Sequence, residues 1–150
     1  MNYSIQQLTE KDVSLMQELN QLFASAFDDD PAYTSKAPSK EYLQSFLQHK
    51  QHIVLVAKDS EKVIGGLVAY VLQKFEQERA EVYIYDLAVA KEYRRQKVAT
   101  NCIKELQTMA AELGAYVIFV QADYGDEPAI KLYQSLGKQE EVLHFDIDVN

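Results

Sequence analysis

A tyrosine-rich apolar stretch, a short basic loop and an amphipathic stretch follow one another in the middle of this chain. Residues Glu81–Val89 have the branched and aromatic composition of a strand. Residues Val98–Leu113 place apolar side chains on one face at helical spacing, and Gly114 ends the predicted helix. Because a strand, loop and helix in this order are a building unit of α/β domains, the sequence predicts a sheet with helices packed on it.

The segments on either side complete this mixed α/β pattern. Helices are expected at Glu10–Ala26, after Ser39, at Val98–Leu113 and after Asp126; strands are expected around Tyr3 and Ile5, and at His52–Lys58, Val63–Lys74, Glu81–Val89, Tyr116–Ala122 and Val142–Ile147. The second and third strands should form a hairpin. The expected fold is therefore a central, mostly antiparallel twisted sheet with two early and two late helices.

Small polar residues and prolines define the expected helix ends. Thr9, Ser39 and Asp126 each precede an apolar-periodic stretch and are the expected N-caps. The first helix should stop at Asp28–Pro31, because a proline disfavours helical backbone at the residue before it. The polar stretch from there to Ser39 is expected to be a loop.

Length and composition exclude several classes of protein. With 150 residues and neither linker nor repeat, the chain is expected to form one domain spanning residues 1–150. No apolar run approaches the roughly 20 residues of a membrane span, and Met1–Glu10 lacks the regions of a signal peptide. A lone cysteine, Cys102, cannot form an internal disulfide. These features predict a cytoplasmic protein.

The charge distribution points to a cationic partner and to one local anion site. A net charge of −8 would repel nucleic acid, although an acidic balance can also serve solubility alone. Against this background, Arg94, Arg95 and Lys97 stand directly before the helix that begins at Val98. Unpaired N–H groups and the helix dipole favour anions at such a position, so the loop is a candidate pyrophosphate site. An ordinary solvated loop is the alternative.

Two blocks of the sequence resemble the GNAT acetyltransferases. Tyr85–Val89, then four residues, then Arg94–Ala99 is similar to that family's core motif of Gln or Arg, two residues, Gly, one residue, and Gly or Ala. Tyr116–Ala122 with Asp126–Gly137 is similar to its second part. The resemblance implies a GNAT fold and acetyl-CoA as cosubstrate. It also exposes a departure, because Lys97 stands where the family has glycine.

Longer strings resemble the type I aminoglycoside 3-N-acetyltransferases, most strongly from about Ala69 to Asp148. They are Tyr70–Leu72, Lys74–Gln77, Tyr83–Val89, Gly114–Ile118, Val120–Asp126 and His144–Asp148. This likeness implies acetylation of the 3-amino group of an aminoglycoside antibiotic, which confers resistance. Two other readings stay open: acetylation of a polyamine or a protein or peptide amine, and a non-catalytic module that binds acetyl-CoA or a partner protein.

The resemblance also implies roles for individual residues. Asp86 interrupts an apolar and aromatic strand and is expected to take a proton from the amine, directly or through water; a structural carboxylate is the alternative. Tyr133 is expected to donate to the leaving thiolate, with core packing as an equal alternative. Asp126 is explained equally well as a helix cap. The cofactor-binding residues implied are Leu87, Ala88, Val89, Arg94, Arg95, Gln96, Lys97, Val98, Ala99, Thr100, Asp126 and Ala129.

Carboxylates are the expected contacts for a polycationic acceptor. For each carboxylate, a solvated surface group is the alternative, and Asp29 and Asp30 could simply end the first helix. Tyr124, next to Gly125, could line the acceptor cleft. The substrate-binding candidates are Asp28, Asp123, Tyr124, Glu127 and Asp146, together with Asp29 and Asp30.

Two further kinds of chemistry are not expected. The three histidines, His49, His52 and His144, are not spaced as metal ligands, so no metal is predicted. Cys102 lies on the apolar face of its predicted helix, which disfavours a covalent acetyl-cysteine mechanism.

A homodimer is implied by the family resemblance alone.

Overall fold

The computed structural model describes residues 2–28 and 30–150. Within them a five-stranded sheet has the order β1-β2-β3-β4-β5, in which β1 to β4 pair antiparallel and β5 joins β4 in parallel. The strands are β1 Ser4–Gln7, β2 His52–Asp59, β3 Lys62–Gln73, β4 Ala80–Val89 and β5 Ala115–Val120. The predicted mixed α/β fold with a mostly antiparallel sheet is confirmed.

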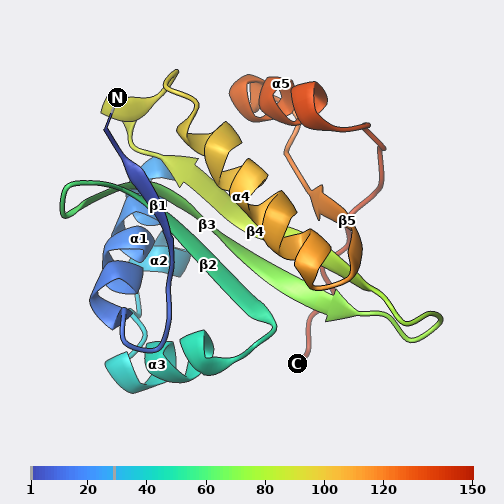
Figure 1. Cartoon of the computed structure of the whole chain (residues 1–150), viewed down its shortest axis with the longest axis horizontal. Coiled ribbons are helices and arrows are strands. Elements are labelled where there is room, and N and C mark those ends of the chain that lie inside the picture. Colours follow the sequence, from blue (N-terminus) through green and yellow to red (C-terminus); the bar gives the residue numbers. More distant parts are fainter. Residues whose placement is uncertain (1, 29) are drawn as a thin grey trace.

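Helices cover both faces of this sheet (Figure 1). On one face lie α1 Val13–Ala26, α2 Pro31–Thr34 and α3 Lys40–Gln48, and on the other lie α4 Val98–Glu112 and α5 Glu127–Leu136. A short 3-10 turn, η1 Lys91–Tyr93, lies in the loop between β4 and α4. No helix in the described ranges has the length and apolar content needed to cross a membrane.

Strand β2 shows why the sheet is the centre of the core. Ile53 and Leu55 belong to the apolar cluster under α4, whereas Val54 and Val56 belong to the cluster under α1 and α3. None of these four side chains is more than 2% exposed. Because neighbouring residues of a strand point to opposite faces, a continuous apolar run is what a strand covered on both faces requires.

The first helix begins later than predicted. It starts at Val13 rather than Glu10, and Asp12 rather than Thr9 occupies the N-cap position. The Asp12 carboxylate accepts hydrogen bonds from the Thr9 backbone N–H at 2.7 Å and from the Thr9 hydroxyl at 3.2 Å. These bonds close a turn over Thr9–Asp12, which competes with helix formation there.

The predicted loop after α1 contains the short helix α2, so that prediction was wrong at this point. The Asp30 carboxylate caps α2 by accepting from the Ala32 N–H at 2.9 Å, and Pro31 occupies the first helical position. Proline is well suited to that position, because its missing N–H would be unpaired there in any case. The Asp30–Pro31 pair therefore begins α2, whereas α1 has already ended at Ala26 with Phe27 as its C-cap.

The predicted final strand, Val142–Ile147, was wrong as well. Residues 138–150 have no regular secondary structure, and their apolar side chains are exposed, from 69% at Val142 to 101% at Val149. Alternating side chains make a strand only where a neighbouring strand supplies hydrogen bonds. Within the described residues, no strand of this chain lies beside the segment.

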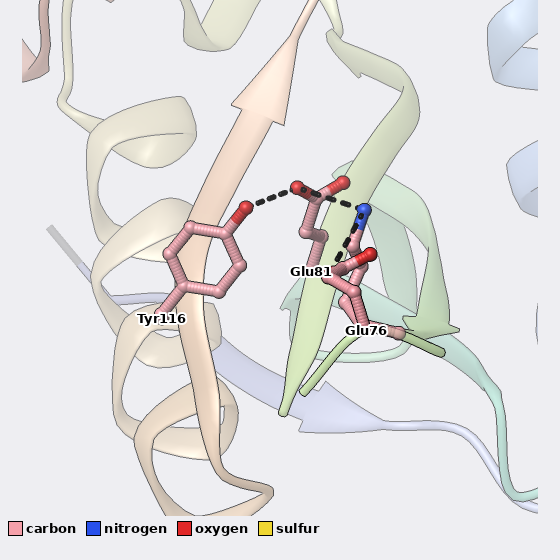
Figure 2. A network of polar contacts seen from close by, with 4 residues as sticks. Glu76, Glu81 and Tyr116 are labelled. Carbon is pink, nitrogen blue, oxygen red and sulfur yellow. Dashed lines mark hydrogen bonds and ion pairs between the residues drawn. The ribbon is translucent and has the colours of Figure 1, made fainter. Parts of the chain in front are cut away.

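A polar network ties β5 to β4 where both strands begin (Figure 2). The Tyr116 hydroxyl of β5 donates a hydrogen bond to the Glu81 carboxylate of β4. The Lys74 ammonium lies 3.7 Å from the carboxylates of Glu81 and Glu76, and the Arg79 guanidinium lies 3.8 Å from the centre of the Tyr116 ring. The two parallel strands are therefore joined at this end, and they separate at the other.

Candidate active site

Strands β4 and β5 separate before β4 ends. Their pairing runs from Ala80 with Ala115 to Ile84 with Val120, whereas β4 continues to Val89. Residues 85–89 therefore have no strand on the β5 side within the described chain, while β3 still pairs with residues 86–89 on the other side. Backbone N–H and C=O groups on the open edge need partners, which a bound molecule can supply. The predicted contacts Leu87, Ala88 and Val89 lie on this edge.

A β-bulge directs the Asp86 side chain. The register between β3 and β4 shifts just before Asp86, which leaves Tyr85 as the extra residue. Before the bulge Ile84 faces the core under α4; after it Leu87 faces that core, and Asp86 shares the opposite face with its cross-strand partner Val68. Without the bulge, simple alternation would point Asp86 toward α4.

Asp86 is half-buried and accepts a hydrogen bond from the hydroxyl of Tyr33, on α2. Burial raises the pKa of the Asp86 carboxyl, the hydrogen bond from Tyr33 lowers it, and the nearby Asp30 carboxylate raises it. Burial and the bond to Asp86 also raise the pKa of the Tyr33 phenol, which therefore stays protonated at neutral pH. The sequence pattern did not predict Tyr33 as a site residue, because it lies in a stretch expected to be a loop.

Aromatic rings lie beside Asp86 on the same side of the sheet. Tyr70 and Tyr85 meet at right angles with their centres 5.8 Å apart, and Tyr83 lies 5.7 Å from Tyr85. Tyr83 also stacks on Phe119 of β5 at 4.6 Å. We call these four residues the tyrosine surface. Aromatic faces attract cations, so this surface next to a carboxylate suits a cationic ligand.

Tyr133 reaches the site from α5, where it packs against the core under α4. Burial raises the pKa of its phenol to about 12, with further contributions from the Asp126 and Asp86 carboxylates. Asp86 is the smallest of these contributions, so the two predicted reacting residues interact electrostatically, without a hydrogen bond between them among the described residues. They approach from opposite faces of the sheet, beside the open edge of β4.

The loop before α4 keeps a glycine-like backbone despite its lysine. Lys97 is the N-cap residue with φ 62° and ψ 22°, and Arg95 also has a positive φ of 64°. Glycine adopts this left-handed region freely, whereas other residues do so at a cost. No side chain of the described residues caps this end of α4, so its first N–H groups remain available. The loop therefore retains the geometry of an anion site.

Neighbouring contacts brace this loop before α4. The Arg94 Nε donates to the Val89 carbonyl at 3.3 Å, which joins the loop to the end of β4. On the other side, the Tyr3 hydroxyl donates to the Gln96 carbonyl at 3.3 Å and accepts from the Asn101 side-chain amide at 2.6 Å. Val98 is buried, while Ala99 and Thr100 lie partly exposed in the first turn of α4.

Replacing Lys97 by glycine should raise the free energy of unfolding by up to about 1 kcal/mol, because the left-handed strain disappears. Chemical denaturation measures this. Lys97→Ala is the matched variant, since it loses the ammonium but keeps the strained backbone. If the ammonium contacts a phosphate, both variants should show a weaker salt dependence of acetyl-CoA binding by calorimetry. A less stable Lys97→Gly variant would contradict the strain.

The residues predicted to bind the acceptor, four carboxylates and Tyr124, lie at the surface. Asp28, Asp123, Tyr124, Glu127 and Asp146 are all exposed. Tyr124 donates to Glu141 at 2.6 Å, and Asp146 pairs with His144 at 2.8 Å. Among the described residues, none of the five has a hydrogen bond or ion pair with Asp86. Asp30 is the acidic neighbour of Asp86, while Asp29 lies outside the described residues.

Two further predicted residues have clear structural surroundings. The Asp126 carboxylate accepts from the Ala129 N–H at 3.4 Å. It therefore caps α5, which was one of the two roles expected for it, the other being a cofactor contact. Cys102 is fully buried on α4, and burial raises the pKa of its thiol to about 12. A thiol in that state is a poor nucleophile.

Comparison with known proteins identifies the family to which this fold and site belong. Residues 15–138 match the model of the acetyltransferase (GNAT) family. The chain belongs to the GNAT acetyltransferases. It is therefore an acetyltransferase, and GNAT enzymes use acetyl-CoA.

Individual relatives of this GNAT chain include drug-modifying enzymes. An aminoglycoside acetyltransferase from an uncultured soil metagenomic sample is 49% identical, with a TM-score of 0.97 and all of both chains covered. A second, in complex with sisomicin and from the same kind of sample, is 32% identical over 99% of this chain and 97% of that one, with a TM-score of 0.92. N-alpha-acetyltransferase 30 of Schizosaccharomyces pombe is 28% identical over 104 residues, 67% of each protein.

Proposed function

We propose that this enzyme transfers the acetyl group of acetyl-CoA to the 3-amino group of an aminoglycoside, and so confers antibiotic resistance. The observation that carries the proposal is the 49% identity, over the whole chain, to an aminoglycoside acetyltransferase. The half-buried Asp86 beside the tyrosine surface adds a site that suits a cationic amine. The position acetylated rests on the resemblance to the type I enzymes alone.

The donor would be held by backbone on two elements. Leu87, Ala88 and Val89 offer the open edge of β4 to the pantetheine arm, and their N–H groups can also stabilise a developing oxyanion. Residues 94–100 would hold the pyrophosphate at the N-terminus of α4. Asp126 and Ala129, at the start of α5, would add a contact. When bound, acetyl-CoA supplies an acetyl group activated as a thioester.

Two side chains would move the protons. Asp86 accepts a proton from the substrate ammonium, directly or through a water, and leaves a nucleophilic amine. Its raised pKa brings it closer to the operating pH than an ordinary aspartate, which helps it to act as a base. Tyr133 keeps its proton at neutral pH and can give it to the departing thiolate. The C–N bond forms as the C–S bond breaks, and the acylated nitrogen then loses its second proton, which restores the Tyr133 phenol, while Asp86 releases its proton to solvent.

The acceptor would be attracted both by carboxylates next to its binding surface and by more distant ones. Asp30 and Asp86 provide negative charge next to the tyrosine surface, where flat rings can pack against an amino sugar. The exposed candidates Asp28, Asp123, Tyr124, Glu127 and Asp146 would then act at longer range on a polycation. The net charge of −8 acts in the same direction.

A protein or peptide amine is the second candidate substrate. The 28% identity to an N-alpha-acetyltransferase favours it, since that relative acts on an amino terminus by its name. Free CoA released with sisomicin, gentamicin, spermidine and short peptides separates these readings. We expect the aminoglycosides to give a kcat/KM at least about 100-fold above that of spermidine or any peptide. A preference for peptides would overturn the proposal, and no release with any amine would favour a binding module.

We also propose that two copies associate through the C-terminal segment 141–149. Its apolar side chains are exposed, and the outer edge of β5 pairs with no strand in the described part of the chain. An exposed strand edge and an unpaired alternating segment are complementary, so each copy could extend the sheet of the other.

Light scattering after gel filtration tests this association. We expect the wild-type chain to be a dimer and the double variant Phe145→Lys, Ile147→Lys to be a monomer, because charge on the segment prevents its burial. Tyr42→Lys changes an exposed aromatic residue on α3, away from β5 and the C-terminal segment, and should leave the dimer intact. A monomeric wild-type protein, or a dimeric double variant, would exclude the C-terminal segment as the interface.

A further inference from the structure

One hydrogen bond links the catalytic strand to a helix that is distant in sequence. The Tyr33 hydroxyl of α2 donates to Oδ2 of Asp86 on β4, across 53 positions of the chain. Oδ1 of Asp86 has no hydrogen-bond partner among the described residues. The bond therefore engages one carboxylate oxygen and leaves the other to face an incoming amine.

The surroundings of Tyr33 hold its hydroxyl in place. Its ring lies 6.1 Å from that of Phe23 on α1 and 5.6 Å from that of Phe27, the C-cap residue of α1. Its backbone N–H donates to the Asp30 carbonyl at 2.9 Å, inside a helix that the Asp30 carboxylate caps. Phe23 is 1% exposed, so the ring rests on the rigid core rather than on a surface loop. A tyrosine anchored in this way can orient its partner.

We propose that Tyr33 is a positioning residue, which fixes the Asp86 carboxylate in one rotamer with Oδ1 directed to the acceptor amine. This inference rests on the proposed function in one respect, namely that Asp86 receives the proton of the amine. It makes the short helix α2 part of the active site. Tyr33 itself need not touch the donor or the reacting atoms.

Loss of the Tyr33 hydroxyl should move the titration of Asp86 in a known direction. The groups that interact electrostatically with Asp86 are Asp30 and Tyr33 from the α2 region, Tyr70 from β3, Tyr83 from β4, and Tyr133 from α5, and its chain neighbour is Tyr85. The bond from Tyr33 lowers the pKa of Asp86, whereas burial and Asp30 raise it. Without the bond the pKa rises. A base must be ionised, so the acid limb of the rate profile should then shift to higher pH.

The test compares pH profiles of kcat/KM for the wild type, Tyr33→Phe and Tyr116→Phe. Tyr116→Phe is the matched control, because it also removes a tyrosine donor to a carboxylate of β4, at the far end of that strand. For Tyr33→Phe we expect kcat to fall roughly tenfold, with the acid limb displaced upward. For Tyr116→Phe the limb should stay in place.

A titration of the Asp86 carboxyl by carbon-13 NMR gives a readout that needs no turnover. Its resonance is assigned by its absence in Asp86→Asn. An upward shift of its pKa in Tyr33→Phe, and none in Tyr116→Phe, supports the inference even if no aminoglycoside is acetylated, an outcome that would defeat the proposed function alone. An unmoved Asp86 pKa would overturn the inference. So would a Tyr33→Phe chain that fails to fold, because the bond would then be structural.

Discussion

Replacing Asp86 by asparagine should lower kcat by at least about 100-fold, because general base catalysis contributes that much or more. Asparagine has nearly the same shape and can still accept the hydrogen bond from Tyr33, but it takes up no proton. The binding of acetyl-CoA should change little, because its proposed contacts on β4 are backbone groups rather than the Asp86 side chain. Steady-state release of CoA and calorimetric titration with acetyl-CoA measure the two effects separately.

Asp86→Asn should also leave the fold intact or make it more stable at neutral pH. The pKa of Asp86 is raised in the folded chain, so its contribution to stability is present at low pH and is lost as the pH rises through that pKa. Urea unfolding at acidic and at neutral pH checks this sign.

Glu81→Gln is the matched control for the loss of kcat in Asp86→Asn, since Glu81 is another tyrosine-bonded carboxylate of β4. Equal losses of kcat in both variants would remove Asp86 from the mechanism.

Replacing Tyr133 by phenylalanine should lower kcat roughly 10- to 100-fold if the phenol gives its proton to the thiolate. The ring packs against the core under α4, and phenylalanine preserves that packing. The KM for acetyl-CoA should therefore stay within about threefold of the wild-type value. Initial rates of CoA release at saturating substrate decide the matter. A kcat within about twofold of wild type would favour the packing reading of Tyr133.

The pH dependence offers an independent check on Tyr133. Because the pKa of its phenol is raised to about 12, the proton is present throughout the neutral and mildly alkaline range. The wild-type rate should therefore not fall between about pH 8 and 10 through loss of this donor. An alkaline limb in that range that disappears in Tyr133→Phe would contradict the raised pKa.

Elements with a strong pattern could be predicted from the sequence. The run from Ile53 to Val56 is apolar at every position, which a strand buried on both faces requires, and Gly114 ends α4 with a positive φ of 77°. Ser39 caps α3 as expected, its hydroxyl accepting from the Tyr42 N–H at 3.1 Å. In these cases local chemistry and tertiary packing favour the same structure.

Features that depend on distant contacts could not be predicted. The bulge at Tyr85 leaves no trace in the spacing of the strand, yet it decides the face to which Asp86 points. Tyr33 reaches Asp86 only because a capped helix follows α1, and the Asp30–Pro31 pair that begins this helix also resembles a simple helix stop. The segment Val142–Ile147 shows the converse case, in which a strand pattern has no partner within the described chain.

The most direct test of the proposed function is the product formed from acetyl-CoA and sisomicin. Mass spectrometry should show the addition of one acetyl group, and NMR should place it on the 3-amino nitrogen. The same reaction with Asp86→Asn should give little product in the same time. Absence of any acetylated sisomicin with the wild-type enzyme, while a peptide or polyamine is acetylated, would contradict the assignment of an aminoglycoside substrate.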